Sequence, residues 1–434
     1  MPDRVTWVAW CARFFAAFSQ LLSIRILIQF LGVEEYAAFA IISSISLWMA
    51  LSDFGLGLTI QNQLAKYFAS EDQEGLKKYF AEMQNALFGL LFIGTPAFLF
   101  IAYGLLLFFV PSEQYLVGGF FASLWFSNFI WCITGILSIV YKAFYGLRRG
   151  HWANVYPAIG TSISLILLVG LSNYYTFDGY RLILCIVAMS VPPLFAASLS
   201  YYHLFFRRFS GCPPRALSAS NQPRIFAAST LISSLKFFVF ALLLQVVLNT
   251  DFIIMSLILP ASEIVAYKII ASMFSFVYSL CYANLLTFWP KSAAALRVGD
   301  VPFVSRALKG NIARSSLFLL LFALMALCLR SPLGAVLSSG QVQLPVVLIV
   351  SFLVLYIIRI IGDSFAVALA SADKTLVFII YLPIQILLSV FLQIYLAERI
   401  GVAGICFGIA LSFLLTACWI NPWAFKRLVL SKRG

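Results

Sequence analysis

The stretch "ALSDFGLGLTI" (Ala50–Ile60) places an aspartate, Asp53, in the middle of a long apolar run. Carboxylates are rare in such runs, because removing one from water costs several kcal/mol unless a partner or a wet cavity receives it. The run extends over residues 36–65, which is long enough for a helix that crosses a membrane. We therefore expect Asp53 to face water or a basic neighbour in a gap between helices, and not lipid.

The composition indicates a membrane protein with many spans. Of the 434 residues, 62% are hydrophobic and 10% are charged, whereas soluble domains are about 45–50% apolar and about 25% charged. The eight cysteines are scattered without a C-x-x-C pair, and only two histidines are present, so neither a disulfide framework nor a metal site is expected. No phosphate-binding G-x-x-x-x-G-K-[ST] motif occurs. The sequence predicts an all-α polytopic membrane protein that is not an enzyme.

Twelve runs are apolar enough, over roughly 20 residues, to cross a membrane. They lie at 5–31, 36–65, 84–110, 115–141, 152–172, 180–206, 226–259, 264–290, 311–330, 344–370, 375–397 and 401–424. The seventh is too long for one straight helix and is expected to bend near Asn249-Thr250. An amphipathic stretch, Lys66–Met83, is expected to lie flat at the interface as a linker helix.

The charges of the connections predict the orientation in the membrane. One alternate set of connections holds 21 Lys and Arg residues, Lys142 among them, and the other set holds 3. Because basic connections remain on the cytoplasmic side, both termini are expected in the cytoplasm. The net charge of +13 is thereby explained without nucleic acid.

The chain resembles itself at a constant shift. "FLGVEEYAAFAI" (Phe30–Ile41) aligns with "ILPASEIVAYKI" (Ile258–Ile269), and each joins a first span to a second. The longest Pro- and Ser-rich interruption, Gly211–Arg224, falls near the midpoint. We therefore predict two six-helix lobes, residues 1–217 and 218–434, with a cavity between them.

Eight charged residues lie inside the predicted spans when Arg181, Arg314 and Arg330, near span ends, are counted with the connections. The cations are Arg13, Arg25, Lys236, Lys268 and Arg359, and the carboxylates are Asp53, Asp251 and Asp363. Embedded charges face a partner or water, so this balance predicts a cationic cavity lined by the five cations. Such a cavity suits a secondary transporter of an anionic substrate, because Arg and Lys hold phosphate by charge-assisted hydrogen bonds.

Structural alternatives remain open for several of these residues. Arg13 and Arg25 are near span ends, from which they can reach the head groups, and Arg359 and Asp363 are four residues apart and can neutralise each other. Lys236 and Lys268 have no acid nearby in the sequence. The three aspartates are candidates for coupling to H⁺ or Na⁺, and no other cofactor is expected.

The second predicted span and its approach resemble a known family. "SIRILIQFLGVEEYAAFAIISSISLWMALSDFGLG" (Ser23–Gly57) is similar to the opening of bacterial Wzx-type polysaccharide flippases, of the multidrug/oligosaccharidyl-lipid/polysaccharide exporter superfamily. The matching positions are Arg25, Leu31-Gly32, Tyr36 and Asp53-Phe54-Gly55-Leu56. "AFYGLRRGHWAN" (Ala143–Asn154) resembles the family's fourth-to-fifth connection. Where many relatives carry Tyr-Gly, this chain has Tyr36-Ala37.

The resemblance implies a MATE-like fold that transfers an undecaprenyl-diphosphate-linked oligosaccharide from the cytoplasmic to the periplasmic leaflet of the bacterial inner membrane, for O-antigen or another surface polysaccharide. The implied partners are that lipid-linked oligosaccharide, membrane lipids and other membrane proteins of polysaccharide assembly. Three alternatives are weighed against it. They are a multidrug or cation antiporter of the same superfamily, which would need an acidic site, a glycan polymerase, which would need a large outer loop, and a membrane scaffold without transport.

Overall fold

The computed structural model describes residues 4–70, 72–108, 118–147, 149–175, 180–208, 228–297, 299–372, 374 and 376–431. Within these ranges the chain forms helices and turns, without strands. It divides into two compact units, Met1–Leu242 and Leu243–Gly434. The boundary between the units lies within helix α9, whereas the lobe boundary expected at 217/218 lies outside the described residues.

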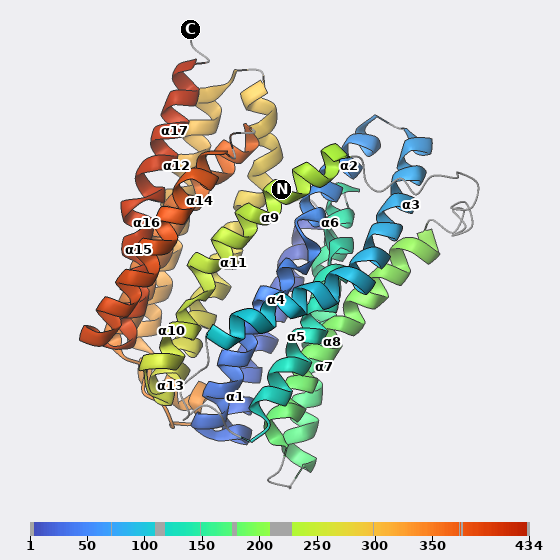
Figure 1. The fold of residues 1–434 in the computed structure, drawn as a ribbon. Coiled ribbons are helices and arrows are strands. Elements are labelled where there is room, and N and C mark those ends of the chain that lie inside the picture. The colour runs from blue at the N-terminus through green and yellow to red at the C-terminus, as the bar shows by residue number, and fades with distance from the viewer. Residues whose placement is uncertain are drawn as a thin grey trace. The chain divides into compact units, whose positions relative to one another are not determined.

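The helices of the first unit are drawn in blue to green in Figure 1. They are α1 (Arg4–Leu47), the 3-10 segment η1 (Trp48–Asp53), α2 (Leu56–Ala69), α3 (Gln73–Gly89), the π-helical segment η2 (Leu90–Gly94), α4 (Thr95–Phe108), α5 (Phe120–Leu137), α6 (Ile139–Gly146), α7 (Gly150–Tyr174), α8 (Arg181–Tyr202) and the π-helical segment η4 (His203–Arg208). Helix α9 (Ala228–Asn249) begins in this unit.

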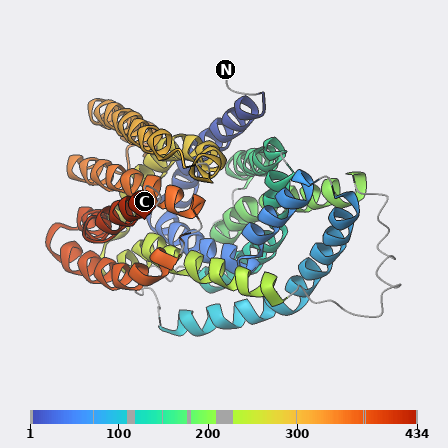
Figure 2. The same ribbon diagram turned by 90° about the horizontal axis from the view of Figure 1, so that it is seen from above.

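The second unit continues in yellow to red. It contains α10 (Asp251–Ile258), α11 (Ala261–Arg297), α12 (Val301–Cys328), α13 (Arg330–Ser338), α14 (Val346–Ser371), α15 (Leu376–Ile400), α16 (Val402–Leu415) and α17 (Ala417–Ser431). Within this unit α15 packs most extensively against α16, and α14 contacts α11, α12 and α16. In the view from above, the orange ribbon of α14 lies beside the gold ribbon of α12 and the red ribbons of the C-terminal helices (Figure 2).

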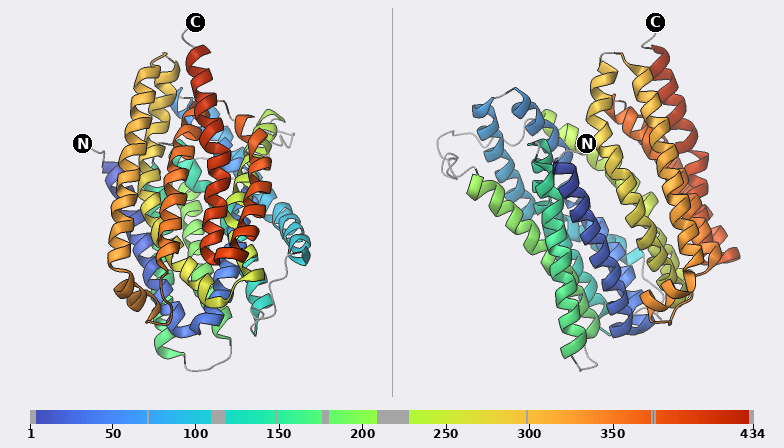
Figure 3. Two further views of the ribbon diagram at one scale, coloured as in Figure 1. Left: turned by 90° about the vertical axis from the view of Figure 1, so that its left-hand side faces the viewer. Right: turned by 180° about the vertical axis from the view of Figure 1, so that it is seen from behind.

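The predicted all-helical membrane fold is confirmed, but the exact count of twelve spans is not. Among the described residues, eleven helices are long and apolar enough to cross a membrane, and the first of them, Trp10–Asp53, has 44 residues. A straight helix of that length would measure about 66 Å, roughly twice the hydrocarbon thickness of a bilayer. Gly32, with φ 77° and ψ 177°, interrupts it. Two helices therefore meet at this glycine. The segment α1 that contains them is drawn in blue in Figure 3.

The two units interrupt their helices at matching positions of the internal repeat. Gly32 of the first unit aligns with Pro260 of the second, which lies between α10 and α11. A glycine at positive φ and a proline without an N–H both prevent the helix from continuing. The same turn is thus encoded twice by different residues.

The bend expected near Asn249-Thr250 is confirmed. Helix α9 ends at Asn249 and α10 begins at Asp251. The Thr250 hydroxyl donates a hydrogen bond back to the Val246 carbonyl at 2.8 Å, a contact that often bends helices.

The prediction for Lys66–Met83 is wrong. Residues 73–83 form the first turns of α3, which belongs to a candidate span over Gln73–Ile101. Asp72 begins the helix by accepting a hydrogen bond from the Gly75 N–H at 2.9 Å. The apolar face of the segment is buried against α6 and η4 within the first unit. The segment is amphipathic, as the sequence predicts, but other helices of the protein cover its apolar face.

Candidate functional site

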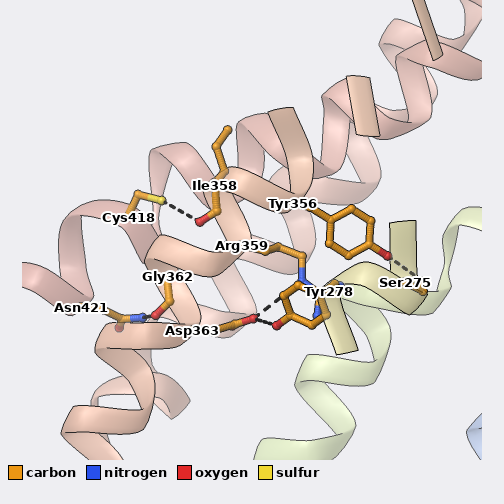
Figure 4. A network of polar contacts seen from close by, with 9 residues as sticks. All are labelled: Ser275, Tyr278, Tyr356, Ile358, Arg359, Gly362, Asp363, Cys418 and Asn421. Atoms are coloured by element: carbon orange, nitrogen blue, oxygen red, sulfur yellow. Dashed lines mark hydrogen bonds and ion pairs between the residues drawn. The ribbon is translucent and has the colours of Figure 1, made fainter. Parts of the chain in front are cut away.

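Arg359 and Asp363 form an ion pair in the second unit. They lie one turn apart on α14, with 3.8 Å between Arg359 Nε and Asp363 Oδ2, and their side chains are 19% and 24% exposed. The Tyr278 hydroxyl of α11 donates a hydrogen bond to the same carboxylate oxygen (Figure 4). The guanidinium carbon lies 4.6 Å from the Tyr278 ring centre and 5.5 Å from that of Tyr356. The cation is therefore shared between a carboxylate and two aromatic faces.

A network of hydrogen bonds fixes this stretch of α14 to its neighbours (Figure 4). The hydroxyl of Tyr356, on α14, lies 2.7 Å from the hydroxyl of Ser275, on α11. On the other side the Asn421 amide of α17 donates to the Gly362 carbonyl at 3.3 Å. The sequence analysis did not name Tyr278 or Tyr356. Tyr356 is three residues before Arg359 on the same helix, so this spacing could have indicated it, whereas nothing local indicates that Tyr278 of α11 contacts Arg359.

Asp251 and Lys268 form a second charged cluster in the same unit. Asp251 is 7% exposed and accepts hydrogen bonds from the Tyr267 hydroxyl at 2.6 Å and from the Phe252 N–H at 2.9 Å. Lys268 interacts electrostatically with Asp251 and lies 5.1 Å from the centre of the Phe252 ring. The acid for Lys268, absent from its sequence neighbourhood, is thus supplied by the preceding helix.

A row of aromatic rings joins the two clusters. The rings of Tyr267 and Phe352 lie 4.9 Å apart, and those of Phe352 and Tyr356 lie 6.2 Å apart. Tyr356 in turn contacts Arg359. The ring of Phe252 of α10, over which Lys268 lies, is 5.4 Å from that of Tyr267. Lys268 and Arg359 therefore lie along one aromatic wall built from α10, α11 and α14.

Asp53 lies at an interruption of its helix. Segment η1 ends at Asp53, and both Phe54 and Gly55 have positive φ. The carboxylate oxygen Oδ1 accepts a hydrogen bond from the Gly55 N–H at 2.9 Å, directly before α2 begins. An aspartate in this position satisfies a backbone donor that the broken helix leaves free.

The basic neighbour of Asp53 is Lys142. The two side chains interact electrostatically, and both pack beside Gly57, where an added Cβ would meet Asp53 Oδ2 at 2.8 Å and Lys142 Cγ at 3.2 Å. From the sequence, Lys142 was placed in a cytoplasmic connection. It instead belongs to α6, within the candidate span Phe120–Gly146. The predicted span 115–141 ends too early because Lys142 interrupts the apolar run, whereas the helix continues to Gly146.

Arg13 belongs to a polar network between α1 and α7. Its Nε donates to Asn154 Oδ1 at 3.0 Å, and the Asn154 amide donates to the Tyr145 hydroxyl at 3.0 Å. Arg13 also lies close enough to Lys142 for the two cations to repel each other. The structure thus brings Arg13 and Asp53 together through Lys142.

Arg25 and Lys236 are not brought into these clusters. Both residues are exposed. Two residues before Lys236, the Ser234 hydroxyl donates to Thr59 Oγ1 at 3.1 Å, so the opposite face of α9 packs on the first unit. Of the eight charges predicted to be embedded and Lys142, the first unit holds four cations (Arg13, Arg25, Lys142 and Lys236) and one aspartate, whereas the second holds two cations and two aspartates. The excess positive charge therefore belongs to the first unit.

No protein-family model matches the chain. Over 98% of its length it is 28% identical to a protein of Yersinia pseudotuberculosis assigned as an O-antigen export protein, covering 97% of that relative. It is also 26% identical, over 95% of its length and 93% of the relative, to an assigned O-antigen transporter of Salmonella typhi. The family resemblance seen in the sequence is confirmed. These relatives are named as transporters, in agreement with a protein that is not an enzyme.

Solved structures show which fold this chain has. A multidrug resistance MATE family transporter of the MOP superfamily, in an inward-facing conformation, matches with a TM-score of 0.73 and 12% identity, over 99% of both chains. The lipid II flippase MurJ matches with a TM-score of 0.67 and 13% identity, over 98% of this chain and 90% of its own. The MATE-like fold of a multi-pass membrane protein is therefore established.

Two substitutions of Asp53 should separate its capping role from its charge. Asp53→Asn keeps an oxygen that accepts the Gly55 N–H, so we expect the stability to change by less than about 1 kcal/mol, whereas Asp53→Ala should cost about 1–2 kcal/mol. The measurement is thermal unfolding of the purified protein in detergent. Equal loss in both variants would show that the charge beside Lys142, and not the cap, holds this region.

Proposed function

We propose that this chain is a flippase that moves an undecaprenyl-diphosphate-linked oligosaccharide from the cytoplasmic to the periplasmic leaflet of the bacterial inner membrane. The product would serve the assembly of O-antigen or another surface polysaccharide. The observation that carries the proposal is the similarity, along 98% of the chain, to an assigned O-antigen export protein. The fold shared with a lipid II flippase supports it.

The embedded cations supply the chemistry that such a substrate needs. A diphosphate leaves its hydration water behind when it crosses the bilayer, and Arg and Lys replace that water with charge-assisted hydrogen bonds. Arg13 and Lys142 of the first unit, with Arg25 and Lys236, carry the excess positive charge. In the second unit, Arg359 and Lys268 become available to an anion when their carboxylates are neutralised.

Because the availability of Arg359 and Lys268 depends on the charge of their carboxylates, an ion that binds a carboxylate could drive the transport cycle. Asp251 and Asp363 each lie beside a cation and accept a hydrogen bond from a tyrosine. Binding of H⁺ or Na⁺ to either carboxylate would release its cation toward the substrate. Asp53 is a weaker coupling candidate, because its carboxylate already serves the start of α2 and Lys142.

The fold likeness to a multidrug transporter makes a cation antiporter the second candidate. A site for cationic drugs requires unpaired carboxylates. In the described part of the chain, Asp53, Asp251 and Asp363 all have a basic neighbour. This pairing argues against a site for cationic drugs at these three aspartates.

Deletion of the gene followed by complementation tests the proposed function. We expect the deletion strain to lack surface polysaccharide and to accumulate the lipid-linked oligosaccharide facing the cytoplasm, and the intact chain to restore the surface polymer. Lipopolysaccharide electrophoresis and extraction of the lipid-linked intermediate give the readouts, and terminal reporter fusions test the cytoplasmic termini. Normal surface polysaccharide in the deletion strain, with loss of cationic-dye efflux, would establish the antiporter instead.

A further inference from the structure

Helix α15 carries a stripe of polar side chains that is buried inside the second unit. Tyr381, Gln385, Ser389 and Gln393 follow one another at intervals of four residues, so they share one slowly turning face of the helix. Gln385, Ser389 and Gln393 are 0% exposed and Tyr381 is 6% exposed. At about 1.5 Å per residue the stripe spans about 18 Å, more than half of the hydrocarbon thickness of a bilayer.

Several amide atoms of this region have no hydrogen-bond partner among the described residues. They are both Nε2 and Oε1 of Gln385, Oε1 of Gln393 and Oδ1 of Asn421. The Gln393 amide nitrogen donates only locally, to Ser389 at 2.9 Å. Polar residues that act as glue between membrane helices bond across the interface, and these atoms do not. Polar groups left unpaired inside a membrane protein are strongly unfavourable, so a polar ligand is required here.

The unpaired atoms identify the chemical class of that ligand. A metal cation would pair with the amide oxygens and leave the Gln385 Nε2 hydrogens unmet, and an anion would do the reverse. Water donates and accepts, and buried waters typically make about three hydrogen bonds to such groups. Exchanging O and N of the Gln385 amide does not alter this argument, because both atoms are unpartnered.

One end of the stripe leads to Asp363. The Asn421 amide donates to the Tyr381 hydroxyl at 3.2 Å and to the carbonyl of Gly362, the residue before Asp363. Tyr381 and Asp363 also interact electrostatically. At the other end, Gln393 lies against Gly408 of α16, near the turn that joins the two helices. Because the Asp363 side chain is 24% exposed, the stripe runs from a partly exposed carboxylate to Gln393, about two turns before the end of α15.

We propose that the buried polar face of α15 holds a file of internal water molecules that exchanges protons with Asp363. A proton from a hydronium ion passes from water to water along Gln393, Ser389 and Gln385 to the Asp363 carboxylate, which becomes a neutral carboxylic acid. The hydronium ion is left as water, and Arg359 loses its charged partner. The inference of a water file rests on the buried amides alone. Its use in driving transport rests on the proposed flippase function.

The water file is tested first by hydroxyl-radical labelling of the purified protein in nanodiscs, where X-ray radiolysis of bound water marks adjacent side chains. We expect Tyr381 to be modified about tenfold faster than Tyr36, which is buried in the first unit, because water bound through one or two net hydrogen bonds raises the local population by about that factor. Gln385→Met should lower this rate, and Leu387→Met, on the exposed face of α15, should not. Equal labelling of Tyr381 and Tyr36 in the unaltered protein would overturn the proposal.

Proton transfer is tested in proteoliposomes with a trapped pH dye and an imposed membrane potential, without substrate. We expect Gln385→Met and Gln393→Met to reduce the proton flux about tenfold relative to the unaltered protein and to Leu387→Met. Unchanged flux in both glutamine variants would overturn the transfer of protons. Neither measurement involves a lipid-linked sugar, so their failure is distinguishable from a failure of the proposed function, which the deletion strain reports.

Discussion

Arg359→Ala is expected to abolish surface polysaccharide and to lower the stability of the protein by about 2–3 kcal/mol. The variant leaves Asp363 charged and partly buried, with the Tyr278 hydroxyl as its remaining partner in the cluster. It also removes the cation that the two tyrosine rings hold in place. Lipopolysaccharide electrophoresis measures transport, and thermal unfolding in detergent measures stability.

A second variant separates the structural from the functional role of this ion pair. Arg359→Ala combined with Asp363→Asn removes both charges, so we expect most of the lost stability to return while transport remains absent. The matched control is Arg399→Ala, because Arg399 also lies over an aromatic ring, 4.4 Å from the centre of Tyr395, but sits at the end of α15. If the double variant restores surface polysaccharide, the pair serves only to neutralise itself and Arg359 binds no substrate.

Gly55→Ala is expected to prevent the first unit from folding correctly, at a cost of about 3–5 kcal/mol. Gly55 has φ +73°, a conformation that residues with a Cβ rarely adopt. An added Cβ would also lie 2.3 Å from the Ser234 carbonyl oxygen and 2.6 Å from the Phe238 nitrogen of α9. Both clashes are with backbone, so no side-chain rearrangement relieves them.

The matched control for this prediction is Gly104→Ala in α4, where no atom lies within 4 Å of the added Cβ. That substitution should be neutral or stabilising by up to about 1 kcal/mol, because alanine favours a helix more than glycine does. The yield of monodisperse protein and its unfolding temperature give the comparison. Equal behaviour of the two variants would show that α9 does not approach Gly55 as closely as the structure has it.

Gly55 gives a physical reason for the Asp-x-Gly-Leu motif. Asp53 satisfies the Gly55 N–H, Gly55 supplies the turn and the close approach of α9, and Leu56 begins α2. The sequence resemblance identified these residues, and the cost of an embedded charge predicted that Asp53 faces water or a basic neighbour. The structure adds a local task for Asp53 and Gly55, which is the interruption of the helix between η1 and α2.

The seventh predicted span shows which features the local sequence predicts and which it does not. The length of the apolar run and the Asn249-Thr250 pair predicted a bend, and the helix is interrupted at Thr250. The partner of Asp251 was not predictable, because the Tyr267 hydroxyl and Lys268 come from the next helix. The buried glutamines of α15 were not predicted for another reason: an amide carries no charge and hardly interrupts an apolar run.

The sequence by itself determined that the chain lies in a membrane and that it is helical. It also determined that its two halves resemble each other and at which residues charges enter the membrane. These follow from apolar length, backbone hydrogen bonding and the cost of burying charge, which are properties of each segment alone. Only the tertiary structure decided which charges meet, as for Asp53 with Lys142 and Lys268 with Asp251. The cost of an embedded charge depends on neighbours from other helices, and those neighbours are fixed only when the helices pack.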